Sequence, residues 1–585
     1  MLHRVMSLQP TPNFHASQWH QRPVWQSHWH ALDTHFDSGQ GFLDTLLAWK
    51  TSHQAPTTLF YTAFAEHAPA NLISGLRQQC FGLLPGIHRI SFEESKVQLT
   101  LCIGPTAQNF KEIDFAADSI CISNLSGHEP RHIARLSKLG TIVHLNNVQF
   151  DDQIQLKTLG FVWDEAQNTA VYQPHWKIKT SVRFSKPDVD SSQQRAIVIG
   201  AGLAGAAVAY SLAKRGWHVD IFDQHPETGG GASGLPAGLF ATHVSPDNNV
   251  LSKITRDGVR ATVQRAASLL RIGQDWNLSH LVEHRYSGKR ELPKDDAWPA
   301  AGLDWSTDAQ ARHKELAGLK PETQALWHPM AGWIQPQALV KAQLAHPQIN
   351  CHFGIKISKL VRHSSTWQLF DEHNQAIASS NLVVIASAHE CQDLLNSVSV
   401  NELPEGGQVP LIPITPLRGQ VTYGAMTLLN QTLIEKLPTF PVNGHGSYIG
   451  NVPSLQSNQP APYWIIGSSF QRFDFDTEAR SEDQLSNLKQ WAELMPAWHD
   501  EILNSVDVTQ AKAWAGIRAA LPDRLPAVGA FQNPSFEGLQ VCTGMGARGI
   551  SWSVLCGELL AAQLKHEPLP MAASLAKLMA ASRFG

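Results

Sequence analysis

The chain has 585 residues, of which 43% are hydrophobic and 16% are charged, so it is long enough for two or three globular domains. Its formal net charge of -4 excludes a uniformly basic surface, although a local patch that binds RNA is compatible with that total. No run approaches the roughly 18 apolar residues of a membrane-spanning helix, and the first ten residues lack the pattern of a secretory signal. We therefore expect a cytoplasmic protein without a membrane segment.

The seven cysteines include no C-x-x-C pair. An odd number without such pairs suits a reducing compartment and argues against a zinc ribbon or an iron–sulfur cluster. Residues 128–132 match the zinc-protease pattern H-E-x-x-H, but Pro130 fits a helix poorly and no third ligand follows. We therefore predict no metal site.

The first 180 residues alternate strand-like and helix-like segments. Residues 58–64, 119–122 and 140–145 are short apolar runs, and residues 41–50 are compatible with a helix. This pattern predicts an α/β domain. The polar stretch at 181–194 contains one proline and is typical of a linker.

A dinucleotide-binding unit is predicted directly after this linker. A β-branched run at 196–199 precedes a glycine-rich turn at 200–205 and an alanine-rich helical segment at 206–215. A second strand at 218–222 then leads to Asp223. Strand, turn, helix, strand and acid follow in the order that nucleotide binding requires.

The turn matches the pattern G-x-G-x-x-G, and each glycine has a physical role. Gly200 permits the tight turn, Gly202 lets the backbone approach a pyrophosphate, and Gly205 lets the helix pack close to the strand. The helix N-terminus presents free N–H groups to phosphates, and Asp223 can accept hydrogen bonds from ribose hydroxyls. The alternative is a structural turn that merely tolerates glycine.

Two later segments favour FAD over NAD. Residues 381–388 resemble the strand and small-residue turn that approach the nucleotide again in FAD-binding folds. Residues 542–560 contain a strand end, a glycine-rich turn at 544–549 and a helix, whose N-terminus would face the flavin pyrimidine ring, where reduction develops negative charge. Simple helix capping is the alternative for this turn.

Six motifs in order carry a family resemblance. They are the turn at 200–205, GASGLPAG at 231–238, HPMAGWIQP at 328–336, PLRGQ at 416–420, WAGIRAALPDRLPAVG at 514–529 and GMGARGISWSVLCGELLA at 544–561. Together they resemble the D-amino-acid oxidase and glycine oxidase superfamily, and more closely the oxidoreductase half of MnmC-type tRNA-modification proteins.

The resemblance implies an α/β fold in two parts. A Rossmann-like, methyltransferase-type domain at 1–180 would precede a two-lobed FAD-binding, glycine oxidase-like domain at 195–585, with an antiparallel sheet in its substrate lobe. The expected parts are FAD-binding segments at about 195–270, 325–400 and 505–585, and substrate-lobe segments at about 271–324 and 401–504.

The resemblance also implies a reaction on the wobble uridine of tRNA. The carboxymethyl group of 5-carboxymethylaminomethyl(-2-thio)uridine would be removed oxidatively, leaving 5-aminomethyluridine and glyoxylate. A hydride would leave the carbon between the amine and the carboxylate for flavin N5, and the imine would hydrolyse. This chemistry needs a cation that orients the carboxylate and a dry flavin face, but no strong base.

Three residues are expected to act on the substrate. Arg518 resembles the carboxylate-binding arginine of glycine oxidase, because a guanidinium fork matches a carboxylate; a structural ion pair is the alternative. Arg548 would assist beside the flavin, and Tyr448 resembles a position near the substrate, although a strand tyrosine is more often packing. The expected FAD-binding residues are Gly200, Gly202, Gly205, Asp223, Ser233, Gly238, Gly544, Gly546 and Gly549.

The N-terminal segment resembles a diverged methyltransferase domain that uses S-adenosylmethionine. Asp37 stands where the family's cofactor loop has its first glycine, and Phe64 stands where a ribose-binding acid is expected, although Glu66 lies two residues on. The family's Leu-Asp-Gly-Phe-Ala-Pro segment appears at 122–127 without its aspartate. We therefore expect methyl transfer to be lost, with S-adenosylmethionine doubtful as a cofactor.

The expected partner is tRNA, with a monomer favoured. Scattered basic residues, Lys177, Lys179, Arg183, Arg312 and Lys314, are candidates for phosphate contacts but singly are more often solubilising. Two other functions stay open: an oxidase of free glycine or D-amino acids, and a non-catalytic flavin-containing tRNA-binding protein.

Overall fold

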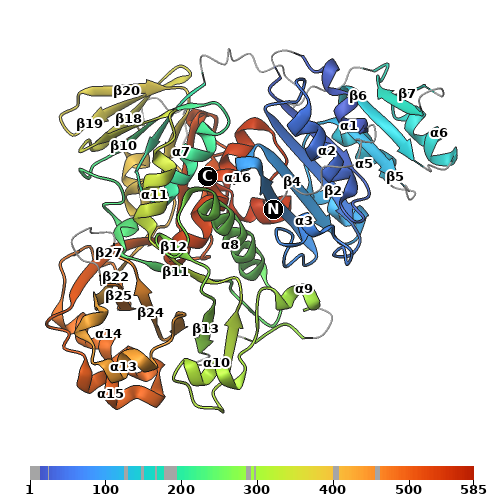
Figure 1. The fold of residues 1–585 in the computed structure, drawn as a ribbon. Coiled ribbons are helices and arrows are strands. Elements are labelled where there is room, and N and C mark those ends of the chain that lie inside the picture. The colour runs from blue at the N-terminus through green and yellow to red at the C-terminus, as the bar shows by residue number, and fades with distance from the viewer. Residues whose placement is uncertain are drawn as a thin grey trace. The chain divides into compact units, whose positions relative to one another are not determined.

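The computed structural model describes residues 13–23, 26–123, 129–146, 150–164, 168–176, 194–284, 291–294, 298–398, 408–454 and 461–585. The chain divides into two compact units (Figure 1). The N-terminal unit comprises Met1–Asp190 and Ala562–Ala576, and the C-terminal unit comprises Ser191–Ala561 and Lys577–Gly585. No described helix is long and apolar enough to cross a membrane. The predicted linker lies outside the described residues except for Gln194.

An eight-stranded sheet is the centre of the N-terminal unit. Its strands are β1 (His28–Asp33), β2 (Thr58–Ala65), β3 (Gly86–Phe92), β4 (Val97–Ile103), β5 (Ala117–Ser123), β6 (Ser137–Asn146), β7 (Phe161–Asp164) and β8 (Thr169–Tyr172). The order is β3-β4-β2-β1-β5-β6-β8-β7. The five central strands from β4 to β6 are parallel, whereas β3 and β8 pair antiparallel with their neighbours.

The helices of this unit alternate with its strands along the chain. They are α1 (Phe14–Ser17), α2 (Gln40–Thr51), α3 (Ser74–Arg77), α4 (Thr106–Glu112), α5 (Glu129–Leu136) and α6 (Phe150–Thr158). Strand β2 has its six inner residues buried, as expected of a strand covered on both faces. The Rossmann-like character predicted for this part is therefore confirmed.

A six-stranded sheet carries the dinucleotide-binding part of the C-terminal unit. Its strands are β9 (Arg195–Ile199), β10 (His218–Asp223), β17 (Ile349–Phe353), β21 (Val383–Ile385), β28 (Ala527–Ala530) and β29 (Leu539–Thr543), in the order β17-β10-β9-β21-β29-β28. All pairs are parallel except β28 with β29. Helix α7 (Leu203–Ala213) follows β9, and ten of its eleven residues are buried, which explains its alanine-rich, uniformly apolar sequence.

A nine-stranded, mainly antiparallel sheet forms the second lobe of this unit. Its strands are β13 (Leu281–His284), β14 (Thr307–Asp308), β15 (Ala325–His328), β22 (Thr415–Ala425), β23 (Val442–Gly444), β24 (Gly446–Val452), β25 (Tyr463–Gly467), β26 (Gln471–Arg472) and β27 (Lys512–Ala520). Helices α13 (Gln431–Lys436), α14 (Ser481–Leu494) and α15 (His499–Ser505) lie together beside this sheet in Figure 1. The antiparallel sheet predicted for the substrate lobe is confirmed.

Shorter elements complete the C-terminal unit. Two three-stranded sheets are formed by β11 (Gly238–Phe240), β12 (Trp276–Asn277) and β16 (Gly332–Ile334), and by β18 (Ile357–His363), β19 (Thr366–Asp371) and β20 (Ala376–Ser380). The remaining helices are α8 (Val250–Leu269), α9 (Ala300–Leu303), α10 (Ala311–Leu316), α11 (Pro336–Leu344), α12 (Cys391–Asn396), α16 (Gly549–Lys565) and α17 (Ala573–Met579).

Residues Ala562–Ala576, which begin with the last residues of α16, belong to the N-terminal unit. The Nη2 group of Arg89 on β3 donates a 3.2 Å hydrogen bond to the carbonyl oxygen of Leu569, and the backbone N–H of Ser574 donates to Glu112 at 2.9 Å. Ala572 packs against the same apolar cluster as Phe161 and Tyr172. The N-terminal unit is thus completed by a segment almost 400 residues away in sequence.

Candidate functional site

A cavity of about 810 Å³ lies at the carboxyl ends of the parallel strands β9, β10, β21 and β29. Open α/β sheets bind ligands at this edge, where the chain leaves neighbouring strands in opposite directions. Strand β27 of the nine-stranded sheet supplies a second wall through residues 513–519. The cavity therefore lies between the two lobes of the C-terminal unit.

The glycine-rich turn has the geometry that its sequence predicts. Gly200 has φ +104°, a conformation that disfavours other residues, and a Cβ there would lie 2.6 Å from the carbonyl oxygen of Ala386. A Cβ on Gly205 would lie 1.7 Å from the carbonyl oxygen of Gly200. At Gly202 a Cβ would come within 3.0 Å of Ser233 Oγ. Gly200 and Gly205 accordingly need glycine because backbone atoms block a Cβ, whereas at Gly202 only the Ser233 side chain would have to shift. Gly200 and Gly202 line the cavity.

Asp223 ends β10 and lines the cavity beside this turn. One carboxylate oxygen accepts a 2.6 Å hydrogen bond from the N–H of Ala201, and the other accepts from the N–H and Nδ1 of His225 at 2.9 and 2.8 Å. These contacts fix the carboxylate while leaving it acceptor capacity, since an ionised carboxylate has about four acceptor positions. Asp223 is therefore placed to accept hydrogen bonds from a ribose.

The other residues expected to bind the cofactor divide into two groups. Ser233 lines the cavity, and its Oγ accepts a 2.9 Å hydrogen bond from the N–H of Leu203 at the start of α7. Gly544, Gly546 and Gly549 also line it, and the first two have positive φ, at +78° and +54°. Gly238 does not: a Cβ there would lie 2.5 Å from Ile550 Cδ1, so the glycine permits close packing of β11.

Arg518 projects from β27 and lines the cavity. Its Nη2 atom is buried and has no hydrogen-bond partner among the described residues, and partial burial lowers the pKa of the guanidinium. The guanidinium carbon lies 5.7 Å from the centroid of the Phe470 ring. A guanidinium that is desolvated without a carboxylate partner favours an anionic ligand.

Gly419 on β22 makes room for this guanidinium. A Cβ at position 419 would lie 2.6 Å from Arg518 Nη2 and 3.1 Å from the carbonyl oxygen of Ser469. We expect Gly419→Ala to displace the guanidinium and to raise the KM for a carboxylate substrate by roughly tenfold, because misplacing one charge-assisted hydrogen bond costs about 1.5–3 kcal/mol. Steady-state kinetics on the flavin-loaded variant check this, and an unchanged KM would contradict it.

Two expected substrate residues do not line the cavity. The side chain of Arg548 lies over the ring of Trp552, with its guanidinium carbon 5.5 Å from the centroid. Tyr448 is fully buried in the core of the second lobe, where its ring stacks on Trp491 at 5.3 Å and burial raises the pKa of its hydroxyl. We therefore assign Tyr448 to packing, the alternative that its place in a strand favours.

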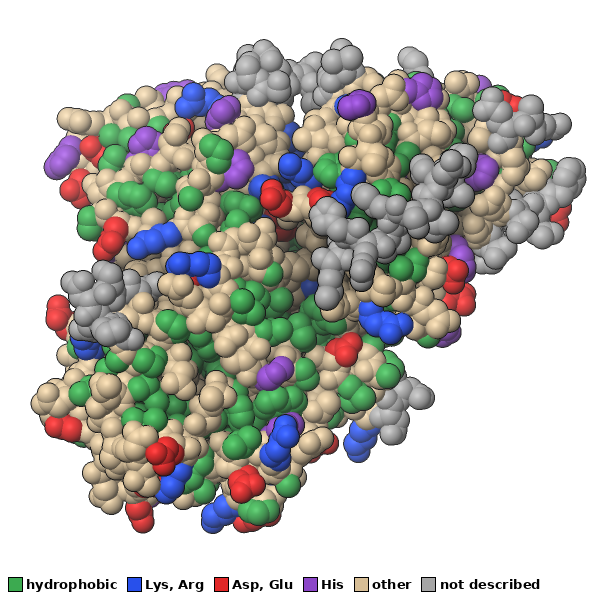
Figure 2. All heavy atoms as spheres, in the orientation of Figure 1, with side chains coloured by type: hydrophobic (Ala, Val, Ile, Leu, Met, Phe, Trp, Pro, Cys, Tyr) green, Lys and Arg blue, Asp and Glu red, His purple; other side chains and the backbone are tan. Residues whose placement is uncertain are grey.

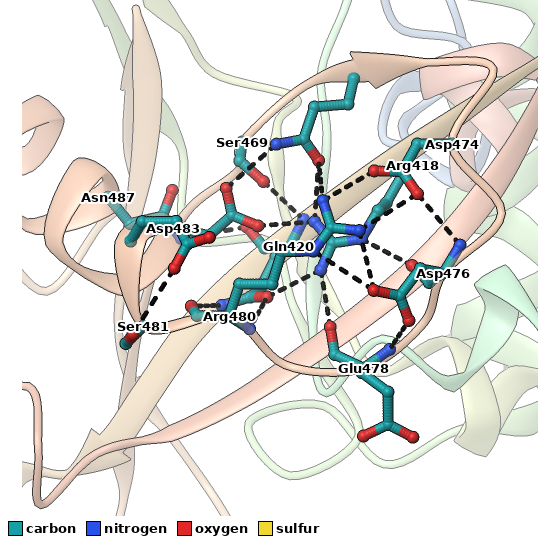
Figure 3. A network of polar contacts seen from close by, with 12 residues as sticks. Arg418, Gln420, Ser469, Asp474, Asp476, Glu478, Arg480, Ser481, Asp483 and Asn487 are labelled. Atoms are coloured by element: carbon teal, nitrogen blue, oxygen red, sulfur yellow. Dashed lines mark hydrogen bonds and ion pairs between the residues drawn. The ribbon is translucent and has the colours of Figure 1, made fainter.

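A loop that no sequence pattern predicted borders the cavity. Residues 473–480 connect β26 to α14, and Thr477 and Ala479 line the cavity. Figure 3 shows the loop held by Arg418 of the PLRGQ motif, whose Nε and Nη2 groups donate to the carbonyl oxygens of Asp476 and Glu478 at 2.6 and 2.7 Å. Because a buried arginine deep in one strand fixes this loop, no local pattern in residues 473–480 could reveal it.

The cofactor loop expected in the N-terminal unit lies after β1. Asp37 has φ +46° and is exposed, so it keeps a glycine-like conformation while adding a carboxylate. Phe64 is a buried core residue of β2, whereas Glu66 follows the last residue of that strand. Glu66 therefore lies just after the strand, the place expected of a ribose-binding acid, whereas Phe64 belongs to the core. Residues 124–127 of the third expected segment lie outside the described residues.

Asp33 at the end of β1 is partly buried, and the resulting desolvation raises the pKa of its carboxyl to about 6. Its oxygens accept hydrogen bonds from Tyr61 Oη at 2.8 Å and from the N–H of His35 at 2.9 Å. Between pH 4 and 6 the unfolded chain releases a proton that the folded chain retains, so stability falls across this window and stays lower above it.

We expect Asp33→Asn to raise the free energy of unfolding of the N-terminal unit by up to about 3 kcal/mol at pH 7.5, and not below pH 4. The asparagine oxygen can still accept one of the two hydrogen bonds. Urea unfolding at both pH values measures the difference. Asp151→Asn, at an exposed position on α6, is the matched control and should change neither value. Equal stabilisation at both pH values would contradict the prediction.

Residues 129–132 of the H-E-x-x-H pattern lie in helix α5. The described part of α5 begins at Glu129 and includes Pro130, while His128 lies outside the described residues. Among the residues described, no group of three His, Cys, Asp or Glu side chains could hold a metal ion.

The geometry of the cavity fits a dinucleotide. Glycine backbone with little room for side chains, the N-terminus of α7 and a strand-end carboxylate lie along one part of the wall, and an arginine that has no anionic partner among the described residues lies on another. Gly200, Gly202, Ser233 and Asp223 would hold the nucleotide portion, and the turn at 544–549 would meet the flavin.

Comparison with known proteins agrees with this geometry. Residues 195–563 match the DAO family of FAD dependent oxidoreductases. The protein named tRNA 5-methylaminomethyl-2-thiouridine biosynthesis bifunctional protein MnmC from Polaromonas naphthalenivorans (strain CJ2) is 37% identical, covering 93% of this chain and 88% of its own. The protein of that name from Polaromonas sp. (strain JS666 / ATCC BAA-500) is also 37% identical, covering 95% and 90%.

A solved structure has a similar fold. L-proline dehydrogenase from P. horikoshii superposes with a TM-score of 0.50 at 15% identity, covering 67% of this chain and 98% of that one. The cavity, the family match and the full-length relatives thus agree. The chain belongs to the DAO family of FAD-dependent oxidoreductases and, over nearly its whole length, to the MnmC family of bifunctional proteins.

Proposed function

We propose that the C-terminal unit oxidises the 5-carboxymethylaminomethyl group of a tRNA wobble uridine, with or without a 2-thio group on the base. The products are 5-aminomethyluridine and glyoxylate. The names of the relatives support a tRNA substrate. The observation that carries the proposal is the guanidinium of Arg518, which lines the cavity with its Nη2 buried and without a partner among the described residues. The substrate side chain is an N-substituted glycine, and its carboxylate supplies the missing anion.

The residues of the cavity position the substrate. Arg518 would bind the carboxylate through its planar fork and thereby orient the adjacent carbon. The apolar part of the wall, including Leu235, Trp514 and Ile550, would limit the water around that carbon. When bound, FAD supplies a two-electron acceptor for oxidation of the C–N bond. Water then adds to the oxidised carbon, and the bond between that carbon and nitrogen breaks. Glyoxylate is released, and the nitrogen stays on the nucleoside as a primary amine.

Anaerobic flavin absorbance of the purified protein tests this function. Bleaching of the oxidised flavin band is expected with tRNA that carries the carboxymethylaminomethyl group, together with release of glyoxylate. Unmodified tRNA is the matched control. Bleaching by glycine or sarcosine alone would replace the proposal with an oxidase of free amino acids. A bound flavin that no substrate reduces would favour a non-catalytic tRNA-binding protein.

We further propose that the N-terminal unit no longer transfers a methyl group. This proposal is supported by Asp37, whose carboxylate stands where the methyltransferase loop requires glycine, while Glu66 alone keeps the position of a ribose-binding acid. The unit would then serve folding or tRNA binding. Calorimetric titration with S-adenosylmethionine should show no binding, and transfer of a labelled methyl group to aminomethyl-tRNA would refute the proposal.

A further inference from the structure

Three phenylalanines are exposed within six residues of the chain, next to the cavity. Phe470, Phe473 and Phe475 expose 55%, 69% and 60% of their surface. Isolated exposed aromatic residues are ordinary, whereas large exposed apolar patches mark binding sites. Three exposed rings on one short segment therefore make this segment a candidate for such a site. Phe473 also has φ +57°, which bulky side chains seldom adopt. Packing within the chain therefore does not explain the exposure of these three rings or the backbone conformation of Phe473.

Contacts place two of the rings at the rim of the cavity. The centroid of Phe470 lies 5.7 Å from the guanidinium carbon of Arg518, and Phe475 contacts the ring of His389 at 5.9 Å. Both Arg518 and His389 line the cavity, as do Thr477 and Ala479 further along the same segment. The exposed aromatic surface is thus continuous with the site of the proposed reaction.

The length of the substrate side chain determines what must lie at this rim. Four bonds separate C5 of the uracil ring from the carboxylate carbon, or about 5 Å when extended. A uracil ring whose carboxylate is bound to Arg518 is thus within reach of Phe470, which lies 5.7 Å from the Arg518 guanidinium carbon. Nucleotides that flank such a uridine would then lie near the exposed rings of Phe473 and Phe475.

The loop that carries these rings is rigidly held. Figure 3 shows Arg480 paired with Asp474 at 2.7 Å and with Asp476 at 2.8 Å. Arg418, fully buried, pairs with Asp483 at 2.5 Å and donates to two carbonyl oxygens of the loop. Arg480 thereby offsets part of the negative charge of Asp474 and Asp476, while Glu478 is exposed. A fixed loop also loses little conformational entropy when a ligand binds.

We propose that Phe470, Phe473 and Phe475 form a stacking platform for the nucleobases that flank the modified uridine in a single-stranded RNA loop. This inference rests on the proposed function. Single-stranded RNA is recognised by splaying its bases onto aromatic rings, independently of their sequence. Basic and acidic side chains are interspersed on the face shown in Figure 2. Stacking of bases on aromatic rings supplies affinity that does not depend on a uniformly basic surface.

The test compares RNA binding with oxidation of a substrate that has no flanking bases. The probes are a synthetic anticodon stem-loop with 5-carboxymethylaminomethyluridine at the wobble position, and the free modified nucleoside. The variants of the full-length, flavin-loaded protein are F473A/F475A, F473L/F475L and F473Y/F475Y. Leu485→Ala, which removes another exposed apolar side chain on α14, is the control. Fluorescence anisotropy gives the Kd for the stem-loop, and anaerobic flavin bleaching gives the rate with the nucleoside.

The Ala and Leu double variants should weaken stem-loop binding by roughly 10- to 100-fold, and by at least tenfold more than they slow nucleoside oxidation. The Tyr double variant and Leu485→Ala should bind like the unaltered protein. Wild-type affinity in the Ala variant, or in the Leu variant that keeps the apolar surface without rings, would overturn the platform. Self-association that depends on these rings, with unchanged Kd, would instead assign the surface to a second copy of the chain.

Failure of the proposed function has a different signature. The flavin of the unaltered protein would then be bleached by neither the stem-loop nor the nucleoside. The Kd comparison among the variants would still decide whether the aromatic rings bind single-stranded RNA.

Discussion

Replacing Arg518 with methionine is expected to lower kcat/KM for the modified tRNA by roughly 10²- to 10³-fold, while flavin stays bound. The side chain lines the cavity, and its Nη2 has no partner among the described residues, so it contributes binding energy only when an anion is present. Loss of a desolvated charge–charge contact costs about 2–5 kcal/mol. Because partial burial already disfavours the free guanidinium, thermal stability should be unchanged or slightly higher.

Arg518→Lys keeps the positive charge but removes the planar guanidinium, so it distinguishes the contributions of charge and shape. It should retain part of the activity with a raised KM, since an ammonium binds a carboxylate as a point charge. Arg271→Ala, at an exposed position outside the cavity lining, is the matched control and should leave the kinetics unchanged. A methionine variant with wild-type kcat/KM would exclude Arg518 as the carboxylate ligand.

Replacing Gly205 with alanine is expected to yield protein without flavin. The added methyl carbon would lie 1.7 Å from the carbonyl oxygen of Gly200, so the turn and the start of α7 must move apart by more than 1 Å. Such overpacking costs 1–3 kcal/mol or more, and it displaces the backbone that faces the pyrophosphate. The visible flavin absorbance of the purified variant and titration with added FAD measure the loss.

Gly549→Ala provides the contrast at another glycine of the cavity. Its Cβ would meet only ordinary contacts, at 3.7 Å from Leu203 and Met545, and its φ is normal for a helix. The protein itself therefore tolerates alanine there, so flavin loss in this variant would locate the flavin against the start of α16. Full flavin content in Gly205→Ala would contradict the assigned role of the turn.

Sequence patterns predicted the strands and helices whose formation depends on residues close together in the chain. The strands expected at 196–199 and 218–222 correspond to β9 and β10, and the helix expected at 206–215 begins three residues earlier, at Leu203. Here the spacing of glycines, small residues and one acid is itself the structural constraint. The fold class followed from these motifs together with the family resemblance.

The parts that sequence did not predict depend on contacts between distant segments. Gly419 matters because β22 and β27 pair in a register that brings it against Arg518, and that register is fixed only in the folded sheet. Arg548 and Tyr448 were chosen by position along motifs, yet the direction of each side chain is set by Trp552 and Trp491 beside it. Resemblance identified the segments, whereas packing decided which side chains enter the cavity.

The return of residues 562–576 to the N-terminal unit has a consequence for synthesis on the ribosome. The oxidoreductase unit is in effect an insertion within the first domain, whose last segment, Ala562–Ala576, is translated only after Ser191–Ala561. Domains generally fold as units in the order in which they emerge. The first domain must therefore wait, incomplete, until the inserted residues have been translated, and a gene fragment that stops after residue 190 would encode a domain without the Leu569 carbonyl that accepts from Arg89.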